Sequence, residues 1–345
     1  MLTIEYQDYD QIAKDESFYI TSLVHKLTLS TAIENQPSKV RLTVIADKNV
    51  KFHNGGRIKI LDGDKGLFLG YIFEMNADEH DEIKLTCYDQ LRYLKNNDVY
   101  ISRGDTLATL FTALCKRFEL KHLVSDTPKT ELPITIHDNK SLYDIISWGI
   151  GITIRNEMKR YIVWDDFGVL ELFEAERYMT DWAFGDNNLV FSFDFSKSID
   201  KDTYNQIKYS QENKDLQVRQ NRIIFNSNTK KRWGTLQFFK TIDEAATPEQ
   251  IVIEMYAKLK LCNHETRKIS FKAIGNWDIR AGKGIWVMLK NALEDTYIQR
   301  GIVSHCTHRL DNDMHTMDLE VEVPRDEDYE KLDDIGAFLT TDTTK

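Results

Sequence analysis

Apolar and polar residues alternate along most of the first 90 positions, which is the pattern of β-strands with one buried face. Two strands are expected within residues 18–46, and three more within residues 57–89. Turns are predicted at HNGG (53–56) and DGDKG (62–66), because glycine supplies the positive φ that tight hairpins require. The pattern therefore predicts a small antiparallel β-barrel, which we place at residues 1–95.

The pattern changes to a helical period near residue 91. In residues 103–120, apolar side chains recur on one helical face behind a candidate N-cap at Asp105. A second helix is expected from Ser141, and residues 160–174 predict a hairpin around Phe-Gly. A small α+β domain is therefore expected at residues 96–195.

Strands return after residue 190. A third helix is predicted at about residues 247–262, with Thr247 as its cap and proline at its first position. We place a second β-barrel domain, including this helix, at residues 196–325. A polar C-terminal tail follows at residues 326–345.

Two stretches of the chain share the same order of landmarks, which predicts an internal duplication. Gly56 and Gly284 each precede a strand, and Gly70 and Gly301 each interrupt a later strand. A glycine inside a strand often marks a bulge or the bend of a barrel corner. Chance similarity between two all-β units remains the alternative.

Each copy is also preceded by a strand pair, within residues 18–46 in the first copy and at residues 190–198 with 205–211 in the second. The predicted fold class is α+β and mainly β, with two similar small antiparallel β-barrel domains separated by a small α+β domain. Three copies of such a chain would place six similar barrels in a ring, which matches a sixfold partner on one side and a threefold partner on the other.

Residues 87–120, CYDQLRYLKNNDVYISRGDTLATLFTALCKRFEL, carry the most specific resemblance to a known family. A strand ends in Tyr-Asp, a Leu-Arg-Tyr-Leu turn follows, and a helix opens with a Thr-Leu pair. With KSLYDIISWGI (140–150), TYNQIKY (203–209) and residues 297–321, the chain resembles the baseplate hub proteins of contractile tails in PBSX-like defective prophages and R-type bacteriocins. More distantly it resembles the tail hubs of phages T4 and Mu and the N-terminal part of type VI secretion spike proteins.

The resemblance implies tail-tube-like barrels and a homotrimer that forms a pseudo-sixfold ring between the sixfold tail tube and the threefold central spike. It implies the tail tube protein, the central spike protein and baseplate wedge proteins as partners, and a structural role without enzymatic activity. We expect synthesis in the bacterial cytoplasm and assembly in the baseplate of a phage or phage-like particle. The tail at 326–345 is expected to become ordered on a partner such as the spike.

The residues expected to matter are architectural. Barrel corners are assigned to Gly56, Gly70, Gly284 and Gly301, and a positive φ at Gly70 or Gly301 would make valine costly there. The resemblance places the junction between the first barrel and the helical domain at Tyr88, Asp89, Leu91, Arg92, Tyr93 and Leu94.

Composition narrows the partners. The 345 residues carry a formal net charge of −10, which disfavours capture of nucleic acid through a basic face. The acidic N-terminus lacks an apolar secretory core, and no run of about 18 apolar residues predicts a membrane span. The 4 cysteines are far apart and are expected to be reduced, buried thiols.

No catalytic, cofactor or metal site is expected. His305, Cys306 and His308 are close in sequence, but no second cluster supplies the remaining ligands of a zinc site. DGDKG lacks the glutamate of a calcium loop, since Phe73 stands at the twelfth position. Two alternatives stay open: a tail-associated cell-wall hydrolase, which a peptidoglycan zymogram would reveal, and a carbohydrate- or receptor-binding tail module, which a glycan array would reveal.

Overall fold

The computed structural model describes the chain except for residues 13, 15, 35, 78, 80, 186–188, 214–217, 243–246, 291–292, 294–295, 312–313, 324–334 and 344–345. The chain forms two compact units. Unit 1 contains Met1–Phe195 and Ile269–Val323, and unit 2 contains Ser196–Lys268 and Pro324–Lys345. The division of the sequence at residues 95, 195 and 325 stays a prediction.

The first half of a 13-stranded sheet is formed by the N-terminal strands of unit 1. These are β1 (Leu2–Gln7), β2 (Phe18–Tyr19), β3 (Val24–Ala32), β4 (Lys39–Ile45), β5 (Arg57–Asp62), β6 (Lys65–Ala77) and β7 (Glu82–Tyr88), with the short helices α1 (Tyr9–Ile12) and η1 (Thr21–Leu23). They pair antiparallel in the order β3-β4-β7-β6-β5-β1-β2. Alternate side chains, such as Leu27 and Leu29, enter one core. We call β3 to β7 the first repeat.

The second half of the sheet comes from strands at the other end of unit 1 and is called the second repeat. It contains β13 (Met179–Gly185), β14 (Val190–Ser198), β18 (Thr266–Ile274), β19 (Gly284–Leu289), β20 (Tyr297–Asp311) and β21 (Met314–Glu322). The order is β14-β18-β21-β20, with β19 between β20 and β13. The strand paired with β14 is thus β18, and the expected pairing with residues 205–211 is wrong.

The two repeats match in register. Gly70 lies opposite Ile58, and a bulge follows between Ile72 and Glu74. In the second repeat, Gly301 lies opposite Ile285, and a bulge follows at the same offset, between Val303 and His305. The predicted fold class is confirmed: the chain is mainly β, with two similar curled antiparallel sheets and an α+β part between them in sequence.

The α+β part packs two helices against short strands around its own core. Its elements are η2 (Gln90–Lys95), β8 (Asn97–Ser102), α2 (Leu107–Arg117), β9 (His122–Val124), β10 (Thr135–Ser141), α3 (Leu142–Glu157), β11 (Tyr161–Asp166) and β12 (Val169–Glu174). Ser141 caps α3 as expected, accepting a hydrogen bond from the Asp144 N–H at 3.1 Å. The N-cap of α2 is Thr106 and not Asp105, because Asp105 accepts a hydrogen bond from the Tyr100 hydroxyl instead.

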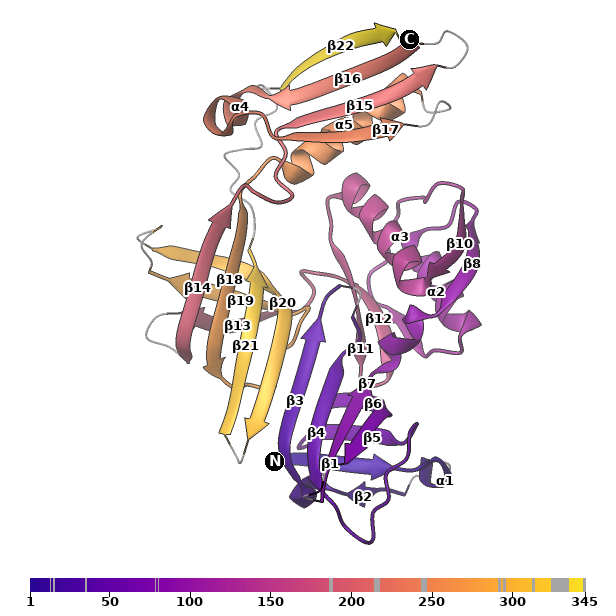
Figure 1. Cartoon of the computed structure of the whole chain (residues 1–345), viewed down its shortest axis with the longest axis vertical. Coiled ribbons are helices and arrows are strands. Elements are labelled where there is room, and N and C mark those ends of the chain that lie inside the picture. Colours follow the sequence, from indigo (N-terminus) through magenta and orange to yellow (C-terminus); the bar gives the residue numbers. More distant parts are fainter. Residues whose placement is uncertain are drawn as a thin grey trace. The chain divides into compact units, whose positions relative to one another are not determined.

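Unit 2 is a four-stranded sheet with one long helix, α5, packed against it (Figure 1). Its elements are β15 (Gln206–Asn213), β16 (Val218–Asn226), α4 (Ser227–Trp233), β17 (Gln237–Ile242), α5 (Pro248–Cys262) and β22 (Ile335–Thr343). Thr247 caps α5 in a capping box with Gln250, as the sequence predicts. Of the predicted polar tail, residues 335–343 form β22 along β16, and residues 326–334 lie outside the described residues.

Candidate functional site

The two repeats are joined where β3 pairs antiparallel with β20 (Figure 1). Seven residue pairs form this joint, from Ala32 opposite His305 to Lys26 opposite Asp311. The hydroxyl oxygens of Ser30 and Thr307 lie 3.0 Å apart across it. The joint makes one continuous sheet from two similar ones.

Each repeat also has an edge at which one side of a strand has no strand partner in the described part of the chain. Residues 73–77 of β6 pair with β7 on one side only, whereas the matching part of β20 lies between β21 and β3. In the second repeat, β14 ends the sheet beyond β18, whereas the matching strand β3 lies between β4 and β20. Backbone N–H and C=O groups of an edge strand are available to another strand.

Asp89 fastens η2 to the first repeat. Its carboxylate accepts hydrogen bonds from the N–H groups of Leu91 at 3.1 Å and Ser38 at 3.0 Å. The residue is 2% exposed, and burial, reinforced by the charge of Asp165, raises the pKa of its carboxyl well above the ordinary value. Leu91 and Leu94 are buried in the core of the α+β part. These contacts support the predicted junction.

Asp165 connects three parts of unit 1, a role that its place in a predicted hairpin turn did not indicate. Its carboxylate accepts hydrogen bonds from the N–H groups of Gly168 at 2.6 Å and Gln90 at 3.1 Å. Its backbone carbonyl accepts one from Arg280, which precedes β19 and lies 4.6 Å from the centre of the Trp164 ring. Burial raises the pKa of Asp165, against the effect of the two N–H donors. The hairpin is thus held to η2 and to the second repeat.

The other predicted junction residues form an aromatic cluster beside β6. The Phe73 ring lies 5.5 Å from that of Tyr88 and 6.1 Å from that of Tyr93. The Arg92 guanidinium lies 5.5 Å from the Phe73 ring centre, within cation–π range. Phe73 is 37% exposed and begins the open edge of the first repeat.

The four predicted corner glycines lie where a side chain would collide with neighbours. A Cβ would overlap the Tyr6 ring at Gly56, the Tyr88 carbonyl at Gly70, Met179 at Gly284, and Val321 at Gly301. None of the four has a positive φ, so that reason for requiring glycine is wrong. Their importance as corners stays a prediction, and close packing is its physical basis.

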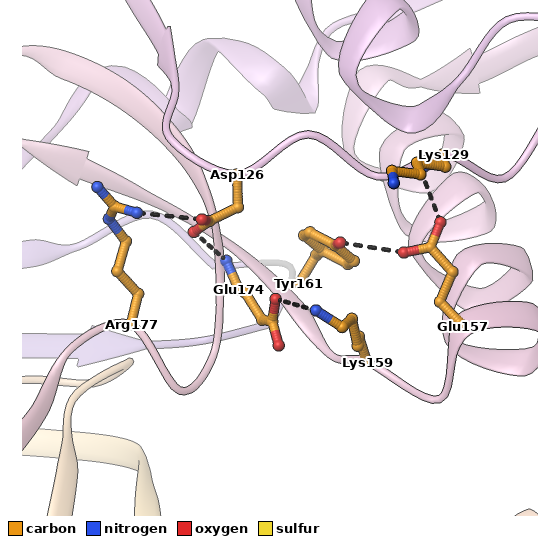
Figure 2. Close-up of polar contacts among 7 residues, drawn as sticks. All are labelled: Asp126, Lys129, Glu157, Lys159, Tyr161, Glu174 and Arg177. Atoms are coloured by element: carbon orange, nitrogen blue, oxygen red, sulfur yellow. Dashed lines mark hydrogen bonds and ion pairs between the residues drawn. The ribbon is translucent and has the colours of Figure 1, made fainter.

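A polar network fastens the end of α3 to the β11–β12 hairpin (Figure 2). Glu157, the last residue of α3, accepts hydrogen bonds from the N–H groups of Lys129 and Thr130, at 2.7 and 2.8 Å, and from the Tyr161 hydroxyl at 3.1 Å. Beside it, Asp126 accepts hydrogen bonds from the Glu174 N–H and from Arg177, both at 3.0 Å, and Lys159 donates to Glu174 at 2.7 Å. Each carboxylate in the figure accepts at least one hydrogen bond, which is the arrangement expected of a structural contact.

Cys306 and His308 lie on the same buried side of β20, as their spacing predicts. The Cys306 thiol is 3.2 Å from Nε2 of His308, while His315 approaches Nδ1 on the other side of that ring. The three side chains therefore do not converge on one point. Within the described residues, no group of three or more His, Cys, Asp or Glu side chains could hold a metal ion. Nor does any helix in the described ranges have the length and apolar character needed to cross a membrane.

Comparison with known proteins agrees with the resemblance seen in the sequence. The profile of the YqbQ-like family matches residues 27–322. The uncharacterised protein YqbQ of Bacillus subtilis is 24% identical over 316 residues, which is 87% of this chain and 94% of that protein.

Solved structures share the fold at low sequence identity. The 43 kDa tail protein of prophage MuSo2 from Shewanella oneidensis has a TM-score of 0.67 and 10% identity, over 92% of this chain and 98% of that one. A type VI secretion component of Escherichia coli, described as similar to the T4 tail proteins gp27 and gp5, has a TM-score of 0.54 and 8% identity, over 89% of this chain and 74% of that one. The predicted resemblance to tail proteins is confirmed at the level of fold.

Proposed function

Because the chain belongs to the YqbQ-like family and has the fold of prophage tail proteins, we propose that it is the structural baseplate hub of a contractile tail or bacteriocin particle. Three copies form a pseudo-sixfold ring that joins the sixfold tail tube to the threefold central spike. The observation that carries this proposal is the joint between β3 and β20, because it links two similar repeats edge to edge inside one chain.

The open edges supply the same joint between copies. Within the chain, β3 of the first repeat pairs with the second half of β20. The matching elements that are paired on one side only are β14, which corresponds to β3, and residues 73–77 of β6, which correspond to the second half of β20. If β14 of one copy pairs with this segment of the next, every repeat has the same neighbours and the ring closes after three copies.

The register of the internal joint specifies the register between copies. Phe195 packs into the core of the second repeat as Leu29 packs into the first, so Ser196 corresponds to Ser30. Asn76 lies two residues after Glu74, which ends the bulge of β6, and Thr307 lies two residues after His305, which ends the bulge of β20. Asn76 therefore corresponds to Thr307, the residue opposite Ser30. Asn76 of one copy should therefore lie opposite Ser196 of the next.

A cysteine pair tests this contact. In the full-length N76C/S196C protein, assembled and then oxidised, we expect disulfide-linked dimers and trimers on a non-reducing gel. Cysteines directly opposite each other on neighbouring strands fall within disulfide range. The matched control is K84C/S196C, because Lys84 lies on β7, which is already paired on both sides. Equal cross-linking in the two variants would contradict the proposed edge contact.

The hub is proposed to act without catalysis and to bind the tail tube, spike and wedge proteins. Electron microscopy of particles that carry a tagged copy should place the tag on the tail axis, between tube and spike. A position at the periphery would favour the receptor-binding alternative, and clearing of peptidoglycan in a zymogram by the purified chain would favour the hydrolase alternative.

A further inference from the structure

Two histidines meet at the joint between the repeats. His308 on β20 lies opposite Leu29 of the first repeat and is 1% exposed. Its Nδ1 atom lies 3.1 Å from Nε2 of His315 on β21. This histidine pair therefore lies on the strand of the second repeat that pairs with the first repeat, and on its neighbour β21.

The histidine pair anchors residues 275–283, the loop that precedes β19. The Trp277 ring stacks on the His315 ring with 3.9 Å between centres and lies 4.7 Å from the His308 ring. The Ile279 carbonyl accepts a hydrogen bond from Nε2 of His308 at 2.8 Å. Ring stacking and one buried hydrogen bond hold Trp277 and Ile279 on β20, and two backbone hydrogen bonds of Val303 with Gly282 and Lys283 hold the end of the loop there.

The same loop reaches the first repeat. The Ala281 N–H donates to the Thr31 hydroxyl on β3 at 3.0 Å. Asp278 forms an ion pair with Lys65, which begins β6. The loop therefore spans the joint, and whatever releases it from β20 also weakens its hold on β3.

The hydrogen bonds of the pair limit how many protons it can carry. Nε2 of His308 faces a carbonyl and must carry hydrogen, so Nδ1 is left to accept from Nε2–H of His315. A proton added to His315 keeps both hydrogen bonds and places a charge beside the core, whereas a proton added to His308 forces His315 into its other tautomer. A second added proton sets one N–H group directly against another.

The surroundings do not favour a charged pair. Burial is the main reason that the pKa of each histidine falls from the ordinary value of 6.5 to about 4. Arg280 lowers the pKa of His308 further, while Asp62 on β5 opposes the fall at His315. Other ionisable groups near the pair include Cys306 on β20, Asp318 on β21, Lys65 on β6, Asp166 on β11, and Asp278 and Lys283 in the loop. From β3, the side chains beside His308 are Leu29 and Thr31, which carry no charge.

We propose that the histidine pair makes the joint between the repeats acid-labile: protonation of both rings sets one N–H group against another, releases Trp277 and Ile279 from β20 and loosens the pairing of β20 with β3. The unfolded chain binds these protons near pH 6.5, whereas the folded chain resists them down to about pH 4. Stability is therefore fully present above about pH 6.5 and is lost as the pH falls from there toward 4. This behaviour belongs to a single chain and does not require the ring.

Thermal unfolding of the full-length protein tests the proposal. Between pH 7 and pH 5, the Tm of the wild type should fall by roughly 5 °C more than the Tm of H308Q/H315F. In this variant, glutamine still donates to the Ile279 carbonyl and phenylalanine still stacks on Trp277, but neither titrates. Falls of equal size in the two proteins would overturn the proposal.

The control is H53Q, because His53 is exposed and pairs with Asp8 far from the joint; it should keep the acid sensitivity of the wild type. Hydrogen exchange in the wild type locates the effect. After correction for intrinsic rates, residues 26–32 and 305–311 should lose protection at pH 5 before β4 and β7 do. If H308Q/H315F fails to fold, NMR titration of the wild-type protein tests the proposal instead. Imidazole pKa values near 4 for His308 and His315 would support it, and pKa values near 6.5 for both would overturn it.

Discussion

At the residue scale, close contact and not backbone conformation explains the strand glycines. Gly70 lies on β6 with the Tyr88 carbonyl and the Phe68 ring where its side chain would be. A backbone atom cannot move aside as the end of a flexible side chain can. A methyl group at Gly70 would therefore displace the neighbouring strand, which destabilises the fold.

G70A should therefore lower stability by about 2 kcal/mol or more, from overpacking alone. G151A is the matched control, because Gly151 lies inside α3 with nothing within 4 Å of a Cβ. That variant should gain roughly 0.5–1 kcal/mol, since alanine favours a helix over glycine. Melting temperatures of the two variants should move in opposite directions, and a loss of stability in both would show that the contact at Gly70 is not the cause.

At the scale of elements, carboxylates fasten loops to helix ends. Although burial opposes it, hydrogen bonds from Thr130 and Lys129 lower the pKa of Glu157. A lowered pKa in the folded chain means that the charged form stabilises the fold. The contribution is present above the ordinary pKa of 4.5 and disappears as the pH falls through the lower folded value.

E157Q should reduce stability at pH 7 by about 1 kcal/mol, because glutamine offers weaker acceptors to the four donor groups and the site is partly open to water. The deficit should shrink below pH 4, where the wild type loses the same charge. E131Q, at an exposed position in the same loop, provides the comparison in thermal melts. A deficit that is independent of pH would show that the charge of Glu157 does not matter.

At the scale of the whole molecule, the last described segment completes unit 2. β22 pairs with β16 along nine residues, from Ile335 opposite Asn226 to Thr343 opposite Val218. Without it, β16 becomes an exposed sheet edge, which favours pairing with other chains.

A chain truncated after residue 334 should show faster amide exchange in β16 and a concentration-dependent dimer in sedimentation, while exchange in β3 and β20 stays unchanged. A synthetic peptide of residues 335–345, added in trans, should restore the protection of β16. Unchanged exchange in β16 after truncation would contradict its pairing with β22.

The sequence by itself determined the local elements and their repetition. Alternation predicted the strands of the first repeat and most of the second, although not β13, and the order of Gly70 and Gly301 within them predicted the duplication that the matching bulges display. Thr247 and Ser141 predicted two helix starts, because capping depends on residues only three positions apart. The prediction of Asp105 as the N-cap of α2 was wrong because Thr106, the next residue, is also a good N-cap.

Only the tertiary structure decided which strands are neighbours. β3 and β20 are joined by residues about 275 positions apart in the sequence, as Thr31 and Cys306 show. β14 pairs with β18 although most of the residues of unit 2 lie between these two strands in the sequence. Any strand with one apolar face satisfies the alternation, so the pattern cannot choose a partner. The contacts of Asp165 with Gln90 and of Ala281 with Thr31 depend on that choice, because they join segments that are far apart in the sequence.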